Sequence, residues 1–449
     1  MTVKGTSRRC RQWPSVAAFL LLTLLVPLAA AITSAHAAGP EDVIVIFRDG
    51  LDATQRDAIL TAAGAVPSRH FQRVSAAAAQ LPDAAVRAAL EQHPDVTAIV
   101  PDRQVQAHAK PDKPGGGGTT GQVVPAGVQR IGAAPGTLAW TGSAIGVAVV
   151  DTGLDFAHQD LQVGATCFTA FTACQDDNSH GTHVGGIIAA LNNTIDVVGV
   201  APNATLYAVK VLDAAGNGTD STVIAGLDWI AQQAGTLAPP VRVVNMSLGR
   251  AGSVDDNPAL RQAVQVLSTR GIAVVVSAGN DPGLEVSQQV PATYPEVMAV
   301  ASTSALDGTN KCRFFTGVIT ADTASWFTTD GAFDPATGIG VTASAPGEDK
   351  EDIAKSCFVQ SVGILSTRLG GGTTRLSGTS MSAPHVAGVV TLLWEKYVAL
   401  GASLTPEEAR SILRSTADRL DAAPLNSPTT GYTFDGEREG VVWAPGALQ

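Results

Sequence analysis

The sequence predicts an α/β protein with a doubly wound, mostly parallel sheet flanked by helices, preceded by a small α+β domain. From about residue 122 onward, short apolar runs alternate with segments of helical periodicity. Several of these runs are apolar at every position, which is typical of parallel strands buried on both faces. Residues 41–107 instead follow the order strand, helix, strand, strand, helix, strand, as in a small open-faced sandwich.

The elements of the first domain follow directly from local patterns. In order, they are expected in EDVIVIFRDG (strand), DATQRDAILTAAGA (helix), SRHFQRVSAAAAQL (strands), PDAAVRAALEQHP (helix) and DVTAIVPDRQVQA (strand). The stretch AKPDKPGGGGTTG then has a Pro/Gly composition that cannot pack, so it is expected to be a linker. The predicted organisation is a segment at 1–37, a domain at 38–107, a linker at 108–121 and a domain at 122–449.

The second domain alternates strands and helices. Strands are expected within 144–153, 204–212, 241–249, 271–280 and 297–302. Helices are expected within 180–191, 221–235 and 257–271, and a further buried helix near Ser380 should carry Pro384 in its first turn. Residues 307–363 are poorly patterned and are expected to form long surface loops.

Residues 1–37 have the organisation of a secretory signal peptide. A basic head that includes Lys4 and Arg8 precedes an apolar run at 16–32, and Ala35-His36-Ala37 is a small-x-small cleavage site. A retained anchor is the alternative, because the run is just long enough to span a bilayer. We expect export to the medium, with the periplasm as the other destination, and no membrane attachment after signal removal.

The net charge restricts the possible partners, and the length sets the size of the core. The chain has 449 residues and a formal net charge of -11, which argues against nucleic acid and anionic membranes as partners. Its length allows a large core and more than one domain.

The cysteines predict two disulfides. Cys10 should leave with the signal, which leaves an even number of cysteines in an exported chain. The short loop favours Cys167 with Cys174, and Cys312 then pairs with Cys357. A metal site is the rival interpretation, although no CxxC or paired-histidine spacing accompanies these residues.

Three polar residues lie at the ends of strands or the starts of helices, where such a sheet gathers its functional groups. Asp151 ends an apolar strand, His180 opens a helix and Ser380 opens another. A serine hydroxyl becomes a good nucleophile when an imidazole takes its proton and a carboxylate orients that imidazole. Each residue also has a structural alternative, namely a strand-end cap, a helix-start residue and a helix N-cap.

The motifs around these residues closely resemble the three catalytic blocks of subtilisin-like serine proteases. They read DTGLD, NSHGTHVGG and GTSMSAPHVAG, in the family's order Asp, His, Ser. The resemblance begins near Gln122 and includes YAVKVL, VVNMSLG, SAGN and SLTPEEARSILRSTA. Residues 41–107 are similar to the family's inhibitory, chaperone-like propeptide.

The resemblance implies further roles. His180 rather than His183 would be the catalytic histidine, and His183 and His385 would be structural neighbours. Asn280 matches the oxyanion-hole asparagine, with the Ser380 backbone N–H as the second donor. A simple turn-forming role is the alternative for Asn280.

Substrate would lie along the Ser247-Leu248-Gly249 segment as an added strand. By the same resemblance, Ala278 and Gly279 would wall the first side-chain pocket, whose base would fall near residues 289–292. The family default is an apolar or aromatic side chain in that pocket.

A loop with the sequence ALNNTIDVVGVAP resembles a calcium-binding loop of many subtilisins. Hard oxygen ligands of this number suit calcium, which would be structural, and no cofactor is expected for catalysis. A helix-ending loop that needs no metal is the alternative. The matching residues are Gln122, Asp160, Leu191, Asn193, Ile195 and Val197.

The expected function is that of a secreted, monomeric serine endopeptidase acting on proteins or peptides. It would be made as a zymogen that its own propeptide inhibits, and self-cleavage would leave a mature start near residues 108–122. A catalytically silent relative is one rival, against which stand the intact Asp151, His180, Asn280 and Ser380. An α/β-hydrolase esterase is another, but Ser382 occupies the position where its G-x-S-x-G motif needs glycine.

Overall fold

The structure of the chain, a computed structural model, describes residues 39–111, 121–428 and 436–449. The predicted signal peptide at 1–37 and most of the predicted linker at 108–121 lie outside the described residues. Within the described ranges, no helix has both the length and the apolar character needed to cross a membrane.

The first domain is a four-stranded antiparallel sheet in the order β2-β3-β1-β4, with two helices packed on it. Each helix begins at an aspartate, Asp52 or Asp83, whose carboxylate accepts backbone N–H groups of the first turn. The elements are β1 (Glu41–Phe47), α1 (Ala53–Ala63), β2 (Val66–His70), β3 (Ala76–Leu81), α2 (Ala84–Glu91) and β4 (Val96–Pro101).

The second domain contains a seven-stranded sheet in which every pairing is parallel, which confirms the predicted fold class. Its order is β16-β15-β13-β11-β7-β9-β8. The strands are β7 (Gly146–Asp151), β8 (Phe168–Thr169), β9 (Thr205–Lys210), β11 (Val241–Met246), β13 (Ala273–Ser277), β15 (Met298–Ser304) and β16 (Val341–Glu348).

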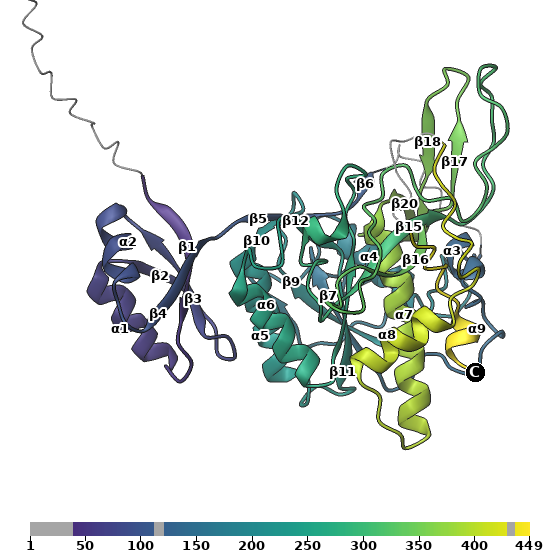
Figure 1. Cartoon of the computed structure of the whole chain (residues 1–449). Helices are drawn as coiled ribbons and strands as arrows, with labels where there is room; N and C mark the ends of the chain where they lie inside the picture. The colour runs from purple at the N-terminus through teal and green to yellow at the C-terminus, as the bar shows by residue number, and fades with distance from the viewer. Residues whose placement is uncertain (1–38, 112–120, 429–435) are drawn as a thin grey trace, which may run out of the picture. The chain divides into compact units, whose positions relative to one another are not determined.

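Helices cover both faces of this sheet (Figure 1). On one face Val147 and Val149 pack against α4 (His180–Ala189) and α7 (Thr379–Ala399). On the other, Ala148 and Val150 pack against α5 (Asp220–Gln233) and α6 (Pro258–Thr269). Burial on both faces explains why the strands are apolar at every position. The remaining helices are α3 (Ala126–Arg130), α8 (Pro406–Ser415) and α9 (Ala444–Ala447).

Helix α7 begins earlier than the sequence predicts. It starts at Thr379, directly after Gly378, so Pro384 lies inside the helix rather than in its first turn. Because proline has no N–H, the carbonyl of Ser380 lacks its usual helical donor. Ser247 supplies one instead, since its Oγ donates to Ser380 O at 2.9 Å.

The prediction of surface loops for residues 307–363 is wrong in part. Strand β16 is buried at every position and forms one edge of the seven-stranded sheet. A separate hairpin of β17 (Lys350–Ile353) and β18 (Val359–Val362) also belongs to this segment (Figure 1). Proline, glycine and serine within β16 resemble a turn in the sequence, yet small side chains suit a strand packed under α7.

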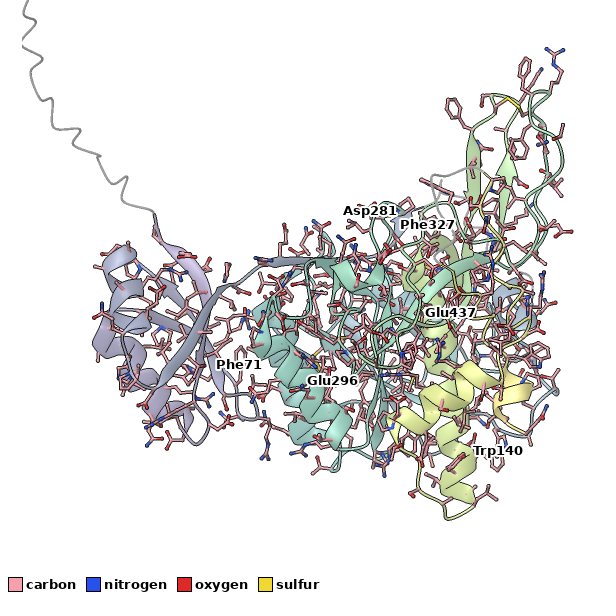
Figure 2. The ribbon with its side chains drawn as sticks, viewed as in Figure 1. Phe71, Trp140, Asp281, Glu296, Phe327 and Glu437 are labelled. Atoms are coloured by element: carbon pink, nitrogen blue, oxygen red, sulfur yellow. A yellow bond between two sulfur atoms is a disulfide. The ribbon has the colours of Figure 1, made fainter. Side chains whose placement is uncertain are left out.

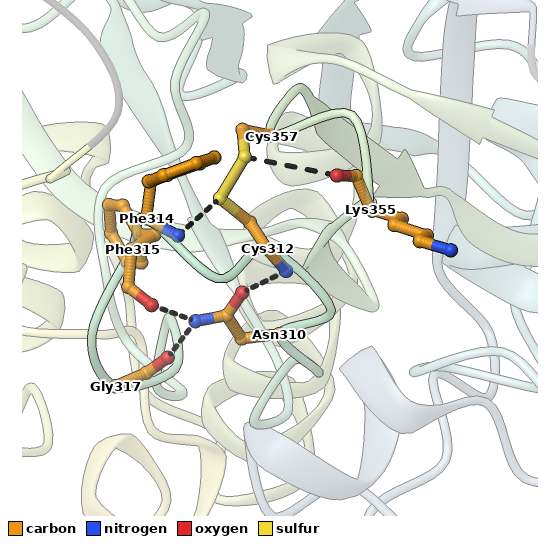
Figure 3. Close-up of a disulfide and its surroundings, with 7 residues drawn as sticks. All are labelled: Asn310, Cys312, Phe314, Phe315, Gly317, Lys355 and Cys357. Carbon is orange, nitrogen blue, oxygen red and sulfur yellow. Dashed lines mark hydrogen bonds between the residues drawn. A yellow bond between two sulfur atoms is a disulfide. The ribbon is translucent and has the colours of Figure 1, made fainter.

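Both predicted disulfides are present, Cys167–Cys174 and Cys312–Cys357. The second connects the loop before the hairpin to the hairpin's own turn (Figure 3). Asn310 supports this loop, because its amide donates to the carbonyls of Phe315 and Gly317.

The close packing of α7 predicts the effect of a small substitution. A Cβ at Gly388 would lie 2.5 Å from Val200 Cβ, so Gly388→Ala should overpack the core and lower the free energy of unfolding by about 1–3 kcal/mol. Over most of that range the loss is larger than the gain of at most about 1 kcal/mol from alanine's helix propensity. We expect a lower midpoint of thermal unfolding in circular dichroism.

Gly235→Ala is the matched control, because no atom lies within 4 Å of a Cβ there. Equal midpoints for the two variants would contradict the packing described for α7.

Candidate active site

The polar groups of the site come from the carboxyl ends of adjacent parallel strands. Asp151 is the last residue of β7, Ser247 directly follows β11 and Asn280 lies shortly after β13. In Figure 2 the labelled Asp281, which follows Asn280, marks this edge of the sheet. Such an edge is where open α/β sheets gather their ligands.

Asp151 and His180 form a buried pair. His180 is the first residue of α4, and its Nδ1 donates to Asp151 Oδ1 at 2.7 Å. Burial lowers the pKa of His180, but the charge and hydrogen bond of Asp151, with Asp176 further away, raise it more, so that the net pKa is above its ordinary value. The imidazole is therefore held in one orientation, with Nε2 available on its other side.

Ser380 is the second residue of α7 and is fully buried. Its Oγ donates to Ser247 O at 3.0 Å and makes no side-chain cap, so the alternative of a helix N-cap is wrong. No hydrogen bond joins Ser380 to His180, whose Nε2 has no partner among the described residues.

Two N–H donors converge on the carbonyl oxygen of His108. Asn280 Nδ2 donates to it at 2.8 Å and the Ser380 backbone N–H at 3.3 Å. Thr379 orients the Asn280 amide, because its N and Oγ1 donate to Asn280 Oδ1 at 3.0 and 2.9 Å. Gly378 has φ 151°, and any side chain there would collide with the same carbonyl. The carbonyl of a peptide bond therefore lies between these two N–H donors.

The chain that carries this carbonyl lies in an extended groove. Strand β5 (Gln104–Ala107) pairs with β10 (Asn217–Thr219) on one side and with β12 (Leu248–Ala251) on the other. Leu248 and Gly249 face Ala107 and Gln106, and the His108 N–H donates to Ser247 O at 3.2 Å. The predicted substrate-binding segment is thus paired with an added strand, and that strand belongs to this chain.

The other predicted site residues lie beside this groove. Ala278 is buried, and Gly279 lies against Gln289, which lines a cavity beside His108. His183 points elsewhere and donates through Nε2 to Ile364 O at 2.9 Å. His385 likewise donates through Nδ1 to Met381 O at 2.7 Å. Neither contacts Ser380 through a hydrogen bond.

The sequence prediction missed two contributors. Asp176 is buried and accepts from Thr152 Oγ1 and from the N–H and hydroxyl of Thr182, so it holds the start of α4 against the end of β7. An aspartate shortly before the NSHGTHVGG block was the available signal. His108 was also missed, because its role depends on pairing with strands far away in sequence.

The six residues of the predicted calcium loop are brought together. Gln122 Nε2 lies between 2.7 and 3.5 Å from four oxygen atoms. An amide has two N–H hydrogens and cannot satisfy four acceptors, whereas its own oxygen, once turned, would join them around a cation. Asp160 accepts from Asn193 Nδ2 and Val197 N, and burial raises its pKa to about 7. The four oxygens are Leu191 O, Asn193 Oδ1, Ile195 O and Val197 O.

This donor set fits a hard cation. Its oxygens are mostly carbonyl and amide, with one carboxylate, which suits calcium rather than a softer metal. In the described ranges, this loop included, no three His, Cys, Asp or Glu side chains are grouped so as to hold a metal ion, so the oxygens of this set come mainly from the backbone and from amides.

Comparisons with known proteins agree with the fold. The family model described as the Subtilase family matches residues 142–432. Subtilisin NAT from Bacillus subtilis subsp. natto is 34% identical over 412 residues, which cover 89% of this chain and 92% of that protein. Subtilisin E from Bacillus subtilis (strain 168) matches to the same extent. An alkaline protease from Alkalihalobacillus alcalophilus is 36% identical over 340 residues, 75% of this chain and 73% of its own.

The family model and these relatives define a serine endopeptidase. The chain belongs to the subtilase family.

Proposed function

We propose that the chain is an exported, self-processing serine endopeptidase in which Ser380 is the nucleophile. His180 takes the Ser380 proton, and Asp151 holds the imidazole and stabilises its cation. Asn280 Nδ2 and the Ser380 N–H stabilise the tetrahedral oxyanion. The observation that carries this proposal is the carbonyl of His108, which accepts hydrogen bonds from both of these donors.

The proposed reaction begins at the Ser380 hydroxyl. The Ser380 hydroxyl turns from Ser247 O to His180 Nε2, loses its proton and attacks the carbonyl carbon. His180 then gives that proton to the leaving amine. In the second half of the reaction, water attacks the acyl-enzyme while His180 takes its proton, and His180 returns that proton to Ser380 Oγ as the acyl bond breaks. Protein and peptide substrates would add as a strand to β12, as β5 does.

The first domain has the role of an intramolecular inhibitor in this proposal. Strand β5 fills the groove that a substrate strand would need, and Asp102 accepts from the N–H and hydroxyl of Ser221 at the start of α5. Cleavage between His108 and Ala109 would release residues 38–108. The basic, apolar segment at 1–37 supports export, and the mature enzyme would act as a monomer.

Calcium is the proposed structural ligand of the loop around Gln122 and Asp160. It would add charge balance and rigidity to a loop beside α4, and the proposed chemistry does not pass through it.

A Ser380→Ala variant separates self-processing from cleavage by a host protease. Wild type should lose the segment that ends at His108 and hydrolyse an added peptide, whereas Ser380→Ala should keep that segment and lose hydrolysis. Intact mass and N-terminal sequence, determined after identical expression, check this. Ser382→Ala is the matched control, because this buried serine lies on the same helix without facing the carbonyl of His108 and should process normally.

If both Ser380→Ala and wild type are trimmed alike, another protease makes the cut. If neither is trimmed and neither hydrolyses peptide, the proposed function is wrong.

A second prediction concerns pH. His180 must be neutral to accept a proton, and its pKa is raised, so kcat/KM should fall as pH falls through that raised pKa. Asp151→Asn removes the charge that raises it and leaves the burial that lowers it. The acid limb should then move to lower pH while kcat falls by roughly 10⁴-fold. An unchanged acid limb in the variant would contradict the assigned pair.

A third prediction tests calcium. A chelator should lower the midpoint of thermal unfolding by about 3–4 °C, as expected for loss of about 2–3 kcal/mol of linked binding in a domain of this size, and calcium should restore it. Asp160→Asn should start from the lower midpoint and respond little to the chelator. A wild type that is insensitive to both chelator and calcium would rule the site out.

A further inference from the structure

The side chain of His108 occupies a pocket beside the carbonyl that Asn280 and Ser380 bind. Its Nδ1 lies 2.9 Å from Ser277 Oγ. A Cβ at Gly249 would lie 2.6 Å from the ring's Cε1, so the imidazole lies directly against this backbone. Ser277 is fully buried, and its hydroxyl hydrogen-bonds to no other side chain or backbone group in the described part of the chain.

The ring does not fill all the space around it. A cavity of about 320 Å³ remains beside it, and His108 itself lines this cavity together with Gly249, Asn280, Leu284 and Gln289. Gln289 is buried, and a Cβ on Gly279 would meet its Cδ at 3.0 Å, so its chain reaches beneath Gly279. A leucine or phenylalanine in this pocket would leave the Ser277 hydroxyl without a partner, which costs binding free energy.

The groups around the imidazole favour its neutral form. Loss of water and the charge of His180 lower the pKa of His108 to about 4, against a smaller opposing effect of a backbone hydrogen bond to Gly249. Arg250 also lines the pocket, but it is bound to Asp220 and Asp256.

Asp281 is the remaining charged group at the pocket, and it is exposed. Its position gives a cation in the pocket a solvent-screened partner at most.

We propose that Ser277 makes the first side-chain pocket selective for a neutral imidazole, so that peptides cleaved after histidine are preferred substrates. This rests on the proposed hydrolysis by Ser380 and departs from the apolar preference that the family resemblance implies. The bond between His108 and Ala109 is then the first substrate of the enzyme.

The test compares peptides of sequence Gln-Val-Gln-Ala-X-Ala-Lys, copied from residues 104–110, with X as His, Leu, Phe, Gln or Lys. For wild type, kcat/KM should be at least about tenfold higher with His than with Leu or Phe. Ser277→Ala should reduce the ratio of His to Leu by about tenfold, because only the histidine peptide loses a partner.

A wild type that prefers Leu or Phe, or a Ser277→Ala variant with an unchanged ratio, would overturn the selectivity and leave the proposed function standing. A wild type that cleaves none of the peptides would overturn the proposed function, and the selectivity with it.

The pH dependence of kcat/KM tests independently whether the histidine side chain of the peptide binds as the neutral imidazole. Free histidine titrates near pH 6.5, so about nine in ten of the histidine peptides are cationic at pH 5.5. The ratio of His to Leu in kcat/KM should therefore fall about tenfold between pH 7.5 and pH 5.5. The leucine peptide reports the titration of His180 alone, and a constant ratio would contradict selection of the neutral ring.

Self-processing supplies the matched control. His108→Leu changes only the segment that is removed, so the mature enzyme is identical to wild type. Processing should slow by about tenfold, while the new N-terminus remains Ala109 and the mature enzyme's peptide preferences are unchanged. Equal processing rates would count against the selectivity.

Discussion

The hydrogen bond between Asn280 Nδ2 and the carbonyl of His108 connects the segment that follows the N-terminal sheet to the seven-stranded sheet. It requires β13 to end where the parallel strands have their carboxyl ends, Thr379 to hold the amide, and glycine at position 378 to leave room for the carbonyl oxygen. It also requires β5 to lie in register between β10 and β12. The parallel sheet, the strand pairing in the groove and the two N–H donors are therefore all needed to bind this one carbonyl oxygen.

The proposed nucleophile, Ser380, is held by a reciprocal contact with Ser247 that follows from a single proline. Pro384 removes the helical donor from Ser380 O, and Ser247 Oγ replaces it, while Ser380 Oγ donates to Ser247 O. Ser247, whose carbonyl accepts from the His108 N–H, is therefore the same residue that fixes the start of α7. In the proposed reaction, the Ser380 hydroxyl leaves this contact before it gives its proton to His180.

Local sequence signals predicted most of the fold and the proposed catalytic groups. Asp151, His180 and Ser380 each end or begin a strongly patterned element, so their motifs were visible without a structure. The edge strand β16 was not, because its proline, glycine and serine imitate a turn. His108 and Ser277 were not either, since their contact joins positions 169 residues apart and depends on strand register.

A crystal structure of the full-length Ser380→Ala variant would show whether the chain's own strand occupies the groove. We predict continuous density through residues 104–110 in the groove, with the His108 carbonyl bonded to Asn280 Nδ2 and its ring against Ser277. Density that leaves the groove empty, or places another residue's carbonyl at Asn280, would contradict it.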